Sequence, residues 1–245
     1  MRCCRKMANN DEDKLYIIIT MCLQNDFCEK IPQITIEEIN SKFGHKVHLN
    51  YEETQRLWGL NNEMDKFIND MMRTAAIANS NDDDFKEYHF IHIRDWHDNS
   101  DREQLSELKV FGDHCIKGTH GAKFISPMDD LIKENLRFNL IVNSNSLNSF
   151  VHTNLDKNLK SIIESCGCDM KNVYIGIIGV VTNIKILFLA YDLSVTYQFP
   201  NVFLCTDLTA GFNKDGHDKG LELINNVALA QTQNLNDFRQ KFEIL

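Results

Sequence analysis

The sequence predicts one α/β domain built on a mostly parallel sheet of five or six strands, with helices on both faces. A chain of 245 residues with 43% hydrophobic residues has the size of one large domain and can form a sizeable core. Short apolar runs rich in β-branched residues alternate with segments of helical periodicity, which is the pattern of repeated βαβ units. Most of these runs are almost continuously apolar, as is typical of strands buried on both faces of a parallel sheet.

The elements follow one another in a regular order along the chain. The apolar runs predict strands at residues 15–21, 89–93, 140–142, 173–178 and 202–205. Helical patterns cover residues 57–79, 128–135, 155–166, 183–193 and 215–233. We expect a domain over residues 14–233, an N-terminal extension over 1–13, and a C-terminal tail over 234–245 that forms a short docking helix. Residues from about 29 to 58 show no clear period and are expected to be an insertion in the first βα connection.

Composition excludes several classes of partner and environment. A net charge of −9 without any basic tract argues against a nucleic-acid-binding surface. The longest apolar runs are far shorter than the ~20 residues of a transmembrane helix, so no transmembrane segment is expected. Eight irregularly spaced cysteines do not form a disulfide framework, and Cys166-Gly-Cys168 is a single CxC without a second pair, so no zinc knuckle is expected. We expect a reducing intracellular compartment, first the cytoplasm, with a mitochondrion or cilium as alternatives.

Four polar clusters follow predicted strands, where ligands bind in parallel α/β sheets. Residues 22–27 (CLQNDF) follow the first strand and residues 95–97 (DWH) follow the second. Residues 179–185 (GVVTNIK) follow the fourth, and residues 207–211 (DLTAG) follow the fifth. Because the carboxyl ends of parallel strands share one edge of the sheet, these clusters predict a single pocket.

These clusters resemble those of the isochorismatase-like cysteine hydrolases, and among them the nicotinamidases. The motifs LQNDFC (23–28), RDWH (94–97), DHCIKGTHGAKF (113–124), GVVTN (179–183) and TDLTAGF (206–212) occur in that family's order. The resemblance spans residues 15–227 or thereabouts. It implies a Rossmann-type three-layer sandwich and hydrolysis of amides or vinyl ethers by an Asp–Lys–Cys triad. In nicotinamidases it also implies a divalent metal that binds the pyridine nitrogen.

All three triad positions of the family are replaced in this chain. By the resemblance, Cys22 stands in place of the general-base aspartate and Lys185 in place of the nucleophilic cysteine. The position of the family's lysine, at the end of the third strand, is Asn143 or Ser144. An ammonium has no lone pair for attack, and loss of a nucleophile or its base typically costs ~10⁶-fold in rate. We therefore expect a pseudoenzyme without catalytic residues.

An inert pocket has two alternatives, a rearranged enzyme and a metabolite sensor. Lys185 could lower the pKa of the Cys22 thiol and create a displaced nucleophile, which would make the chain an amidohydrolase with a rearranged active site. In the simpler interpretation, Cys22 is a small buried hydrophobic residue and Lys185 pairs with a carboxylate or a partner chain. The leftover pocket could also serve as a metabolite sensor.

The metal ligands of the resemblance are better preserved than the triad. Asp95, His97 and His114 match the nicotinamidase ligands, with Glu103 or Glu107 as the fourth, and this donor set suits Zn, Fe or Mn. A hydrogen-bonded polar cluster without metal is the alternative, and an inactive protein would require no cofactor.

The expected role is that of a structural or accessory subunit in a larger protein assembly. Members of this family commonly self-associate, so the partners are other protein subunits in a homo-oligomer or a hetero-oligomer with homologues. The insertion and the two termini are the expected interfaces. Cys115, beside His114, is expected to be a core residue.

Overall fold

A single six-stranded parallel sheet organises the molecule. The computed structural model describes residues 13–43, 47–80, 86–101, 104–135 and 137–244. The strands are β1 (Lys14–Met21), β2 (Lys86–Asp95), β3 (Asn139–Ser144), β4 (Val173–Val180), β5 (Val202–Ala210) and β6 (Gln231–Gln233). Their order across the sheet is β3-β2-β1-β4-β5-β6, and every neighbouring pair is parallel. The predicted parallel α/β architecture is confirmed.

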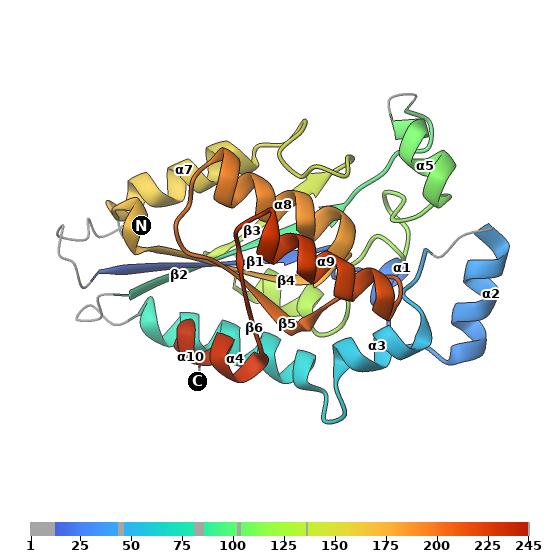
Figure 1. Cartoon of the computed structure of the whole chain (residues 1–245), viewed down its shortest axis with the longest axis horizontal. Helices are drawn as coiled ribbons and strands as arrows, with labels where there is room; N and C mark the ends of the chain where they lie inside the picture. Colours follow the sequence, from blue (N-terminus) through green and yellow to red (C-terminus); the bar gives the residue numbers. More distant parts are fainter. Residues whose placement is uncertain (1–12, 44–46, 81–85, 102–103, 136, 245) are drawn as a thin grey trace.

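Helices cover both faces of this sheet. Figure 1 shows α7, α8 and α9 on one face and α3, α4 and α10 on the other, while α1, α2 and α5 lie at the end where β1 finishes. The helices are α1 (Asn25–Cys28), α2 (Gln33–Phe43), α3 (Tyr51–Trp58), α4 (Glu63–Ala78), α5 (Leu105–Phe111), α6 (Met128–Glu134), α7 (Leu155–Cys166), α8 (Leu187–Tyr191), α9 (Lys214–Asn226) and α10 (Leu235–Lys241). A 3₁₀ turn, η2 (Met170–Asn172), precedes β4, and wide π-helical turns, η3 (Thr182–Ile186) and η4 (Asp192–Thr196), flank α8.

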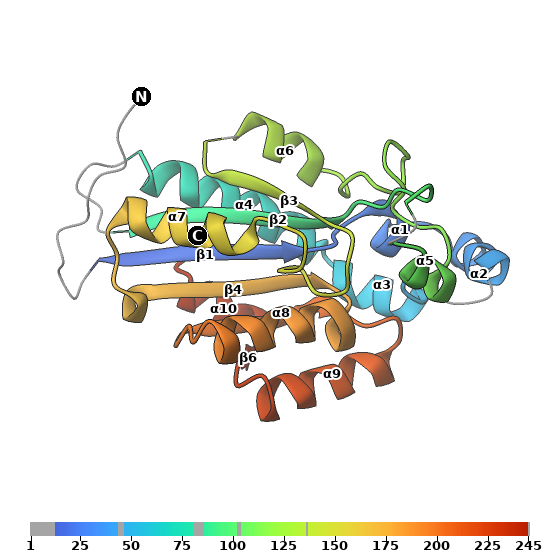
Figure 2. The ribbon, with the colours of Figure 1, turned by 90° about the horizontal axis from the view of Figure 1, so that it is seen from above.

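A strongly apolar strand, β1, lies at the centre of the sheet. β1 lies between β2 and β4, and seven of its eight residues are buried. Figure 2 shows β1 and its neighbours side by side, with their ends at the same edge. Continuous burial on both faces explains why the run at 15–21 has no polar alternation.

Two helix predictions were wrong in their boundaries. The helix expected over 57–79 is two helices, because α3 ends at Trp58 before Gly59 (φ +72°), and Asn62 before α4 has a left-handed conformation. The expected insertion at 29–58 contains α2 and α3. The helix expected over 215–233 ends at Asn226, and residues 231–233 instead pair with β5 as the edge strand β6. The short helix α5 was not predicted.

The C-terminal residues pack into the core as α10. Phe238 and Phe242 are fully buried and stack on each other with ring centroids 4.5 Å apart. Gly176 in β4 leaves the space that they fill, since a Cβ there would lie 2.6 Å from the Phe238 ring. The Glu243 carboxylate accepts hydrogen bonds from Tyr16 (2.7 Å) and from the ammonium of Lys14 (3.2 Å) at the start of β1.

The structure also bears on the expected membrane segments and cysteines. No helix in the described part of the chain is long and apolar enough to cross a membrane. The six cysteines in that part form no disulfide, and five of them are buried. Cys115 is one of the buried five, and burial raises its pKa well above the ordinary value, as a core residue requires.

Candidate functional site

The predicted pocket lies where β1, β2 and β4 end. It is lined by Cys22, Phe27, Asp95, Glu107, Phe111, His114, Leu147, Val180, Val181, Ile184, Lys185 and Phe212. The cavity between these side chains is small, with a volume of about 20 Å³.

The turn after β4 carries Lys185 into this pocket. Gly179 has φ +120°, and a Cβ there would lie 2.1 Å from the Met21 carbonyl oxygen, so only glycine fits between β4 and β1. The chain then enters η3, and such π-type turns are common at functional sites. Lys185 is buried, with 4% of its surface exposed.

Two carboxylates surround the Lys185 ammonium. Its Nζ donates a hydrogen bond to Asp95 Oδ1 and lies 3.8 Å from Glu107 Oε1. Burial lowers the pKa of Lys185 to about 8, and Cys22 opposes this shift. The pKa of Lys185 thus stays above neutral pH, and its ammonium is paired with Asp95. The residue at the elbow is therefore a paired cation.

Cys22 is held at the end of β1 in a left-handed conformation. Its φ is +48°, its backbone N–H donates to the Ile93 carbonyl (2.8 Å), and its side chain is buried. Burial raises the pKa of the Cys22 thiol to about 11, even though the Lys185 ammonium opposes the shift. The buried thiol is therefore protonated at neutral pH. This does not favour Cys22 as a displaced nucleophile.

The two candidates for the third triad position face different directions. Asn143 is exposed, and its Oδ1 accepts a hydrogen bond from Arg94 Nε (2.7 Å). Ser144 is buried, pairs in register with Asp95, and donates its hydroxyl to the Ser146 carbonyl (2.9 Å). The inward position at the end of β3 is thus Ser144, whose hydroxyl is not a base.

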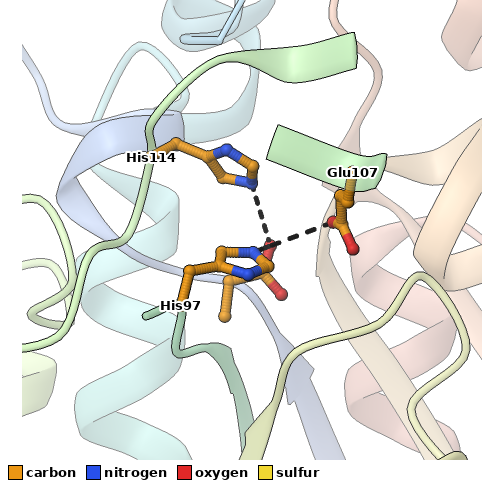
Figure 3. Close-up of side chains that lie close together, drawn as sticks. His97, Glu107 and His114 are labelled. Atoms are coloured by element: carbon orange, nitrogen blue, oxygen red, sulfur yellow. Dashed lines mark ion pairs between the residues drawn. The ribbon is translucent and has the colours of Figure 1, made fainter. Parts of the chain in front are cut away.

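Four possible metal ligands converge beside Lys185. The ligand atoms of Asp95, His97, Glu107 and His114 all lie within 4.8 Å of one another. Asp95 Oδ2 lies 3.6 Å from His114 Nε2 and 3.8 Å from His97 Nε2, which in turn lies 3.8 Å from Glu107 Oε1. Figure 3 shows His97, Glu107 and His114 directed toward a common point. Glu103, the other predicted fourth ligand, lies outside the described residues.

The surroundings orient both imidazoles toward this point. His114 Nδ1 donates to the Gly112 carbonyl (2.8 Å) and His97 Nδ1 to Gln104 Oε1 (3.2 Å), which leaves each Nε2 lone pair free. Burial lowers the pKa of His97, and the nearby His114 lowers it further. His97 Nε2 and Asp95 Oδ2 are buried without a hydrogen-bond partner among the described residues. Buried ligand atoms without a hydrogen-bond partner fit the binding of a divalent cation.

Sequence reasoning missed the residue that fixes Asp95. Gln24, inside the motif at 23–28, receives a hydrogen bond from Asp95 N (2.7 Å) and donates one to the Asp95 carbonyl (2.8 Å). The only sign of this role in the sequence was the position of Gln24 inside the motif.

Glu107 was one of the two residues predicted as the fourth metal ligand, and the sequence of its helix α5 has no strong periodicity. Burial raises the pKa of Glu107, which the two histidines partly offset.

Comparison with known proteins defines the fold. No protein-family model matches the sequence, and no curated protein matches it. Similar solved structures include the nicotinamidase/pyrazinamidase of Bacillus subtilis, with a TM-score of 0.64 and 19% identity over 90% of this chain and 100% of that chain. An isochorismatase-like hydrolase from Alkaliphilus metalliredigens has a TM-score of 0.59 and 22% identity over 94% of this chain and 99% of that one.

A third similar structure is the pyrazinamidase of Pyrococcus horikoshii in complex with zinc. Its TM-score is 0.55 and its identity 17%, over 90% of this chain and 99% of that one. Sequence identities this low establish the fold alone. The chain has the fold of the nicotinamidase and isochorismatase-like hydrolases, so that fold prediction is confirmed.

Proposed function

We propose that this chain is a catalytically inactive relative of the nicotinamidases and isochorismatase-like hydrolases, and that it serves as a structural or accessory subunit of a larger protein assembly. The observation that carries the proposal is Lys185. It occupies the elbow after β4, where the resemblance expects a nucleophilic thiol, and its ammonium is buried against Asp95. A paired ammonium cannot attack a carbonyl carbon.

The other two triad positions support the same conclusion. Acyl transfer by a cysteine needs a base to take the thiol proton and a cation to stabilise the ionised groups. Cys22 is protonated at pH 7 and does not act as that base, and Ser144 carries no charge. The chemistry would have to be rebuilt at all three positions.

The narrow pocket favours a metabolite sensor less than a role in assembly. Phe27, Phe111 and Phe212 line the same space as Lys185, and the cavity that they leave has a volume of about 20 Å³. Binding of a nicotinamide-sized molecule would require these aromatic side chains to move.

A divalent cation would be held by Asp95, His97, Glu107 and His114. In a nicotinamidase such an ion supplies an electrophilic centre for the pyridine nitrogen of the substrate. Here Lys185 already provides a positive charge to Asp95 and lies near Glu107, so it partly neutralises the same carboxylates. The four side chains therefore fit a metal ion, while the positive charge of the neighbouring ammonium opposes its binding.

Exposed apolar residues in and beside the expected insertion support a role in assembly. Ile34 in α2 is 66% exposed, and Leu60, two residues after α3 and just outside the insertion, is fully exposed. Exposure of a large apolar side chain to water is unfavourable, and contact with a partner that covers it lowers the free energy.

The test is to isolate the protein gently from its native cells and to measure the size and composition of what accompanies it. A stoichiometric complex, together with no release of ammonia from nicotinamide by the purified chain, is the expected result. Turnover of nicotinamide that stops when Cys22 is alkylated would overturn the proposal in favour of a rearranged amidohydrolase. A free monomer or homodimer that binds a small molecule would instead establish the sensor.

A further inference from the structure

A second group of metal-binding side chains lies at the opposite end of the sheet from the pocket. Glu87 and His89 stand near the start of β2, whereas Asp95 ends the same strand. Eight residues of strand separate Glu87 from Asp95, which is about 25 Å. This second cluster is therefore independent of Lys185 and its neighbours.

The fold brings a cysteine to these two residues. Glu87 and His89 alternate with the buried Tyr88, so both point to the same face of β2. Cys166, the last residue of α7, is buried on that face, and its Sγ lies 3.9 Å from His89 Nε2. The ligand atoms of Glu87, His89 and Cys166 all lie within 4.8 Å of one another.

The spacing is close to that of a tetrahedral site. Zinc bonds of about 2.0 Å to nitrogen and 2.3 Å to sulfur place the two ligand atoms about 3.5 Å apart. The observed separation of 3.9 Å between Cys166 Sγ and His89 Nε2 needs only a small closure. Glu87 Oε1, now 2.7 Å from His89 Nε2, would open by about 0.6 Å when a cation replaces their shared hydrogen bond.

The charges and exposure of the cluster also suit a divalent cation. A carboxylate and a thiolate together balance two positive charges, and neutral imidazole completes a mixed O, N and S donor set that favours zinc. The side chains of His89 and Glu87 are 16% and 22% exposed, so an ion can enter from solvent. Burial acts to raise the pKa of Glu87, but hydrogen bonding to His89 outweighs it, and the carboxylate is ionised.

We propose that Glu87, His89 and Cys166 bind a zinc-class divalent cation, with water in the fourth position. Cys168 is not among the three residues whose ligand atoms converge, so its thiol is not a ligand. The sequence concealed this site, because Cys166-Gly-Cys168 has no second pair nearby. The histidine and carboxylate come from β2, and His89 precedes Cys166 by 77 residues.

Cobalt(II) is a suitable probe, because a thiolate ligand gives it an intense near-ultraviolet charge-transfer absorption that nitrogen and oxygen ligands do not. We expect the reduced full-length protein to show this absorption with Co²⁺ and to lose it when Zn²⁺ displaces the cobalt. Cys166→Ser should abolish the absorption. Cys168→Ser, the same change two residues away, should retain it, as should Cys22→Ser and Asp95→Asn at the other end of the sheet.

A stability measurement covers the case in which Cys166→Ser fails to fold. In Asp95→Asn, which removes a ligand of the other cluster, Zn²⁺ at about 100 times its Kd should raise Tm by about 5 °C. When His89→Gln is added to Asp95→Asn, that rise should disappear. The proposal is wrong if the wild type shows no thiolate absorption, if Cys168→Ser loses it, or if the double variant keeps the full rise in Tm.

Discussion

Removing the charge of Lys185 should strengthen the binding of a divalent cation by Asp95, His97, Glu107 and His114. The ammonium lies 3.8 Å from Glu107 Oε1 and is paired with Asp95. An ion bound to these carboxylates at about 2 Å would therefore lie about 5 Å from Nζ. At an effective dielectric constant of about 20, the repulsion between one and two charges at that distance is about 7 kcal/mol.

Only part of this repulsion should appear in the measured affinity. The lysine side chain can swing aside when the ion enters, and water screens the remainder. We expect Lys185→Met to bind Zn²⁺ more tightly by at least about 2 kcal/mol, which is about 30-fold in Kd. Without metal the same variant should be less stable by about 3 kcal/mol, because Asp95 loses its buried partner.

Competition with a chromogenic chelator measures the Kd directly. Both proteins should carry His89→Gln, so that the cluster around Cys166 does not contribute. Lys160→Met is the matched control, because it removes the same charge from an exposed position on α7. A Kd for Lys185→Met within threefold of its parent would show that the ammonium does not oppose the metal.

Three further predictions concern catalysis, pH and backbone. Lys185→Cys should release no ammonia from nicotinamide in a coupled assay, since a new thiol would still lack a base and a lysine; detectable turnover would contradict the proposed function. Burial acts to raise the pKa of Glu243, but hydrogen bonds from Lys86, Tyr16 and Lys14 hold it at about 2, below its ordinary 4.5. This stabilisation is therefore complete above pH 5 and is lost as the pH falls toward 2. Glu243→Gln should lower the free energy of urea unfolding by about 1–2 kcal/mol at pH 7, after allowance for solvent screening, and by almost nothing at pH 2; an equal loss at both would refute the pairing. Gly179→Ala should cost about 3 kcal/mol or more in the same assay, whereas Gly118→Ala, also at positive φ but in open space, should cost about 1 kcal/mol; equal losses would refute the close approach of β4 to β1.

Sequence patterns predicted the strand cores but not their ends. Continuous apolar runs located β1 and the centre of β2, because a strand that is buried on both faces consists almost entirely of apolar residues. The polar ends of β2, from Lys86 and up to Asp95, carry no such signal. The edge strand β6 was predicted as helix, since Gln231 to Gln233 owe their strand conformation to pairing with β5 and not to their own propensity.

The candidate site shows the same division. Asp95, His97 and His114 could be named from motif order, and the structure places them together. The contact between Lys185 and Asp95 depends on how far β2 and β4 extend and on the π-type turn, which a one-dimensional pattern does not contain. The cluster of Glu87, His89 and Cys166 depends wholly on tertiary placement.

The position of α10 has a consequence for synthesis on the ribosome. Tyr16 in the central strand donates a hydrogen bond to Glu243, 227 residues later. At 5–20 residues per second, the ribosome needs about 11–45 s to make the intervening chain. During that time β1 lacks Phe238 and Phe242, and until residue 180 is made it also lacks its neighbour β4. Nascent chains therefore expose part of an apolar strand for about 11–45 s, and their yield in cells should depend on chaperones that bind before translation ends.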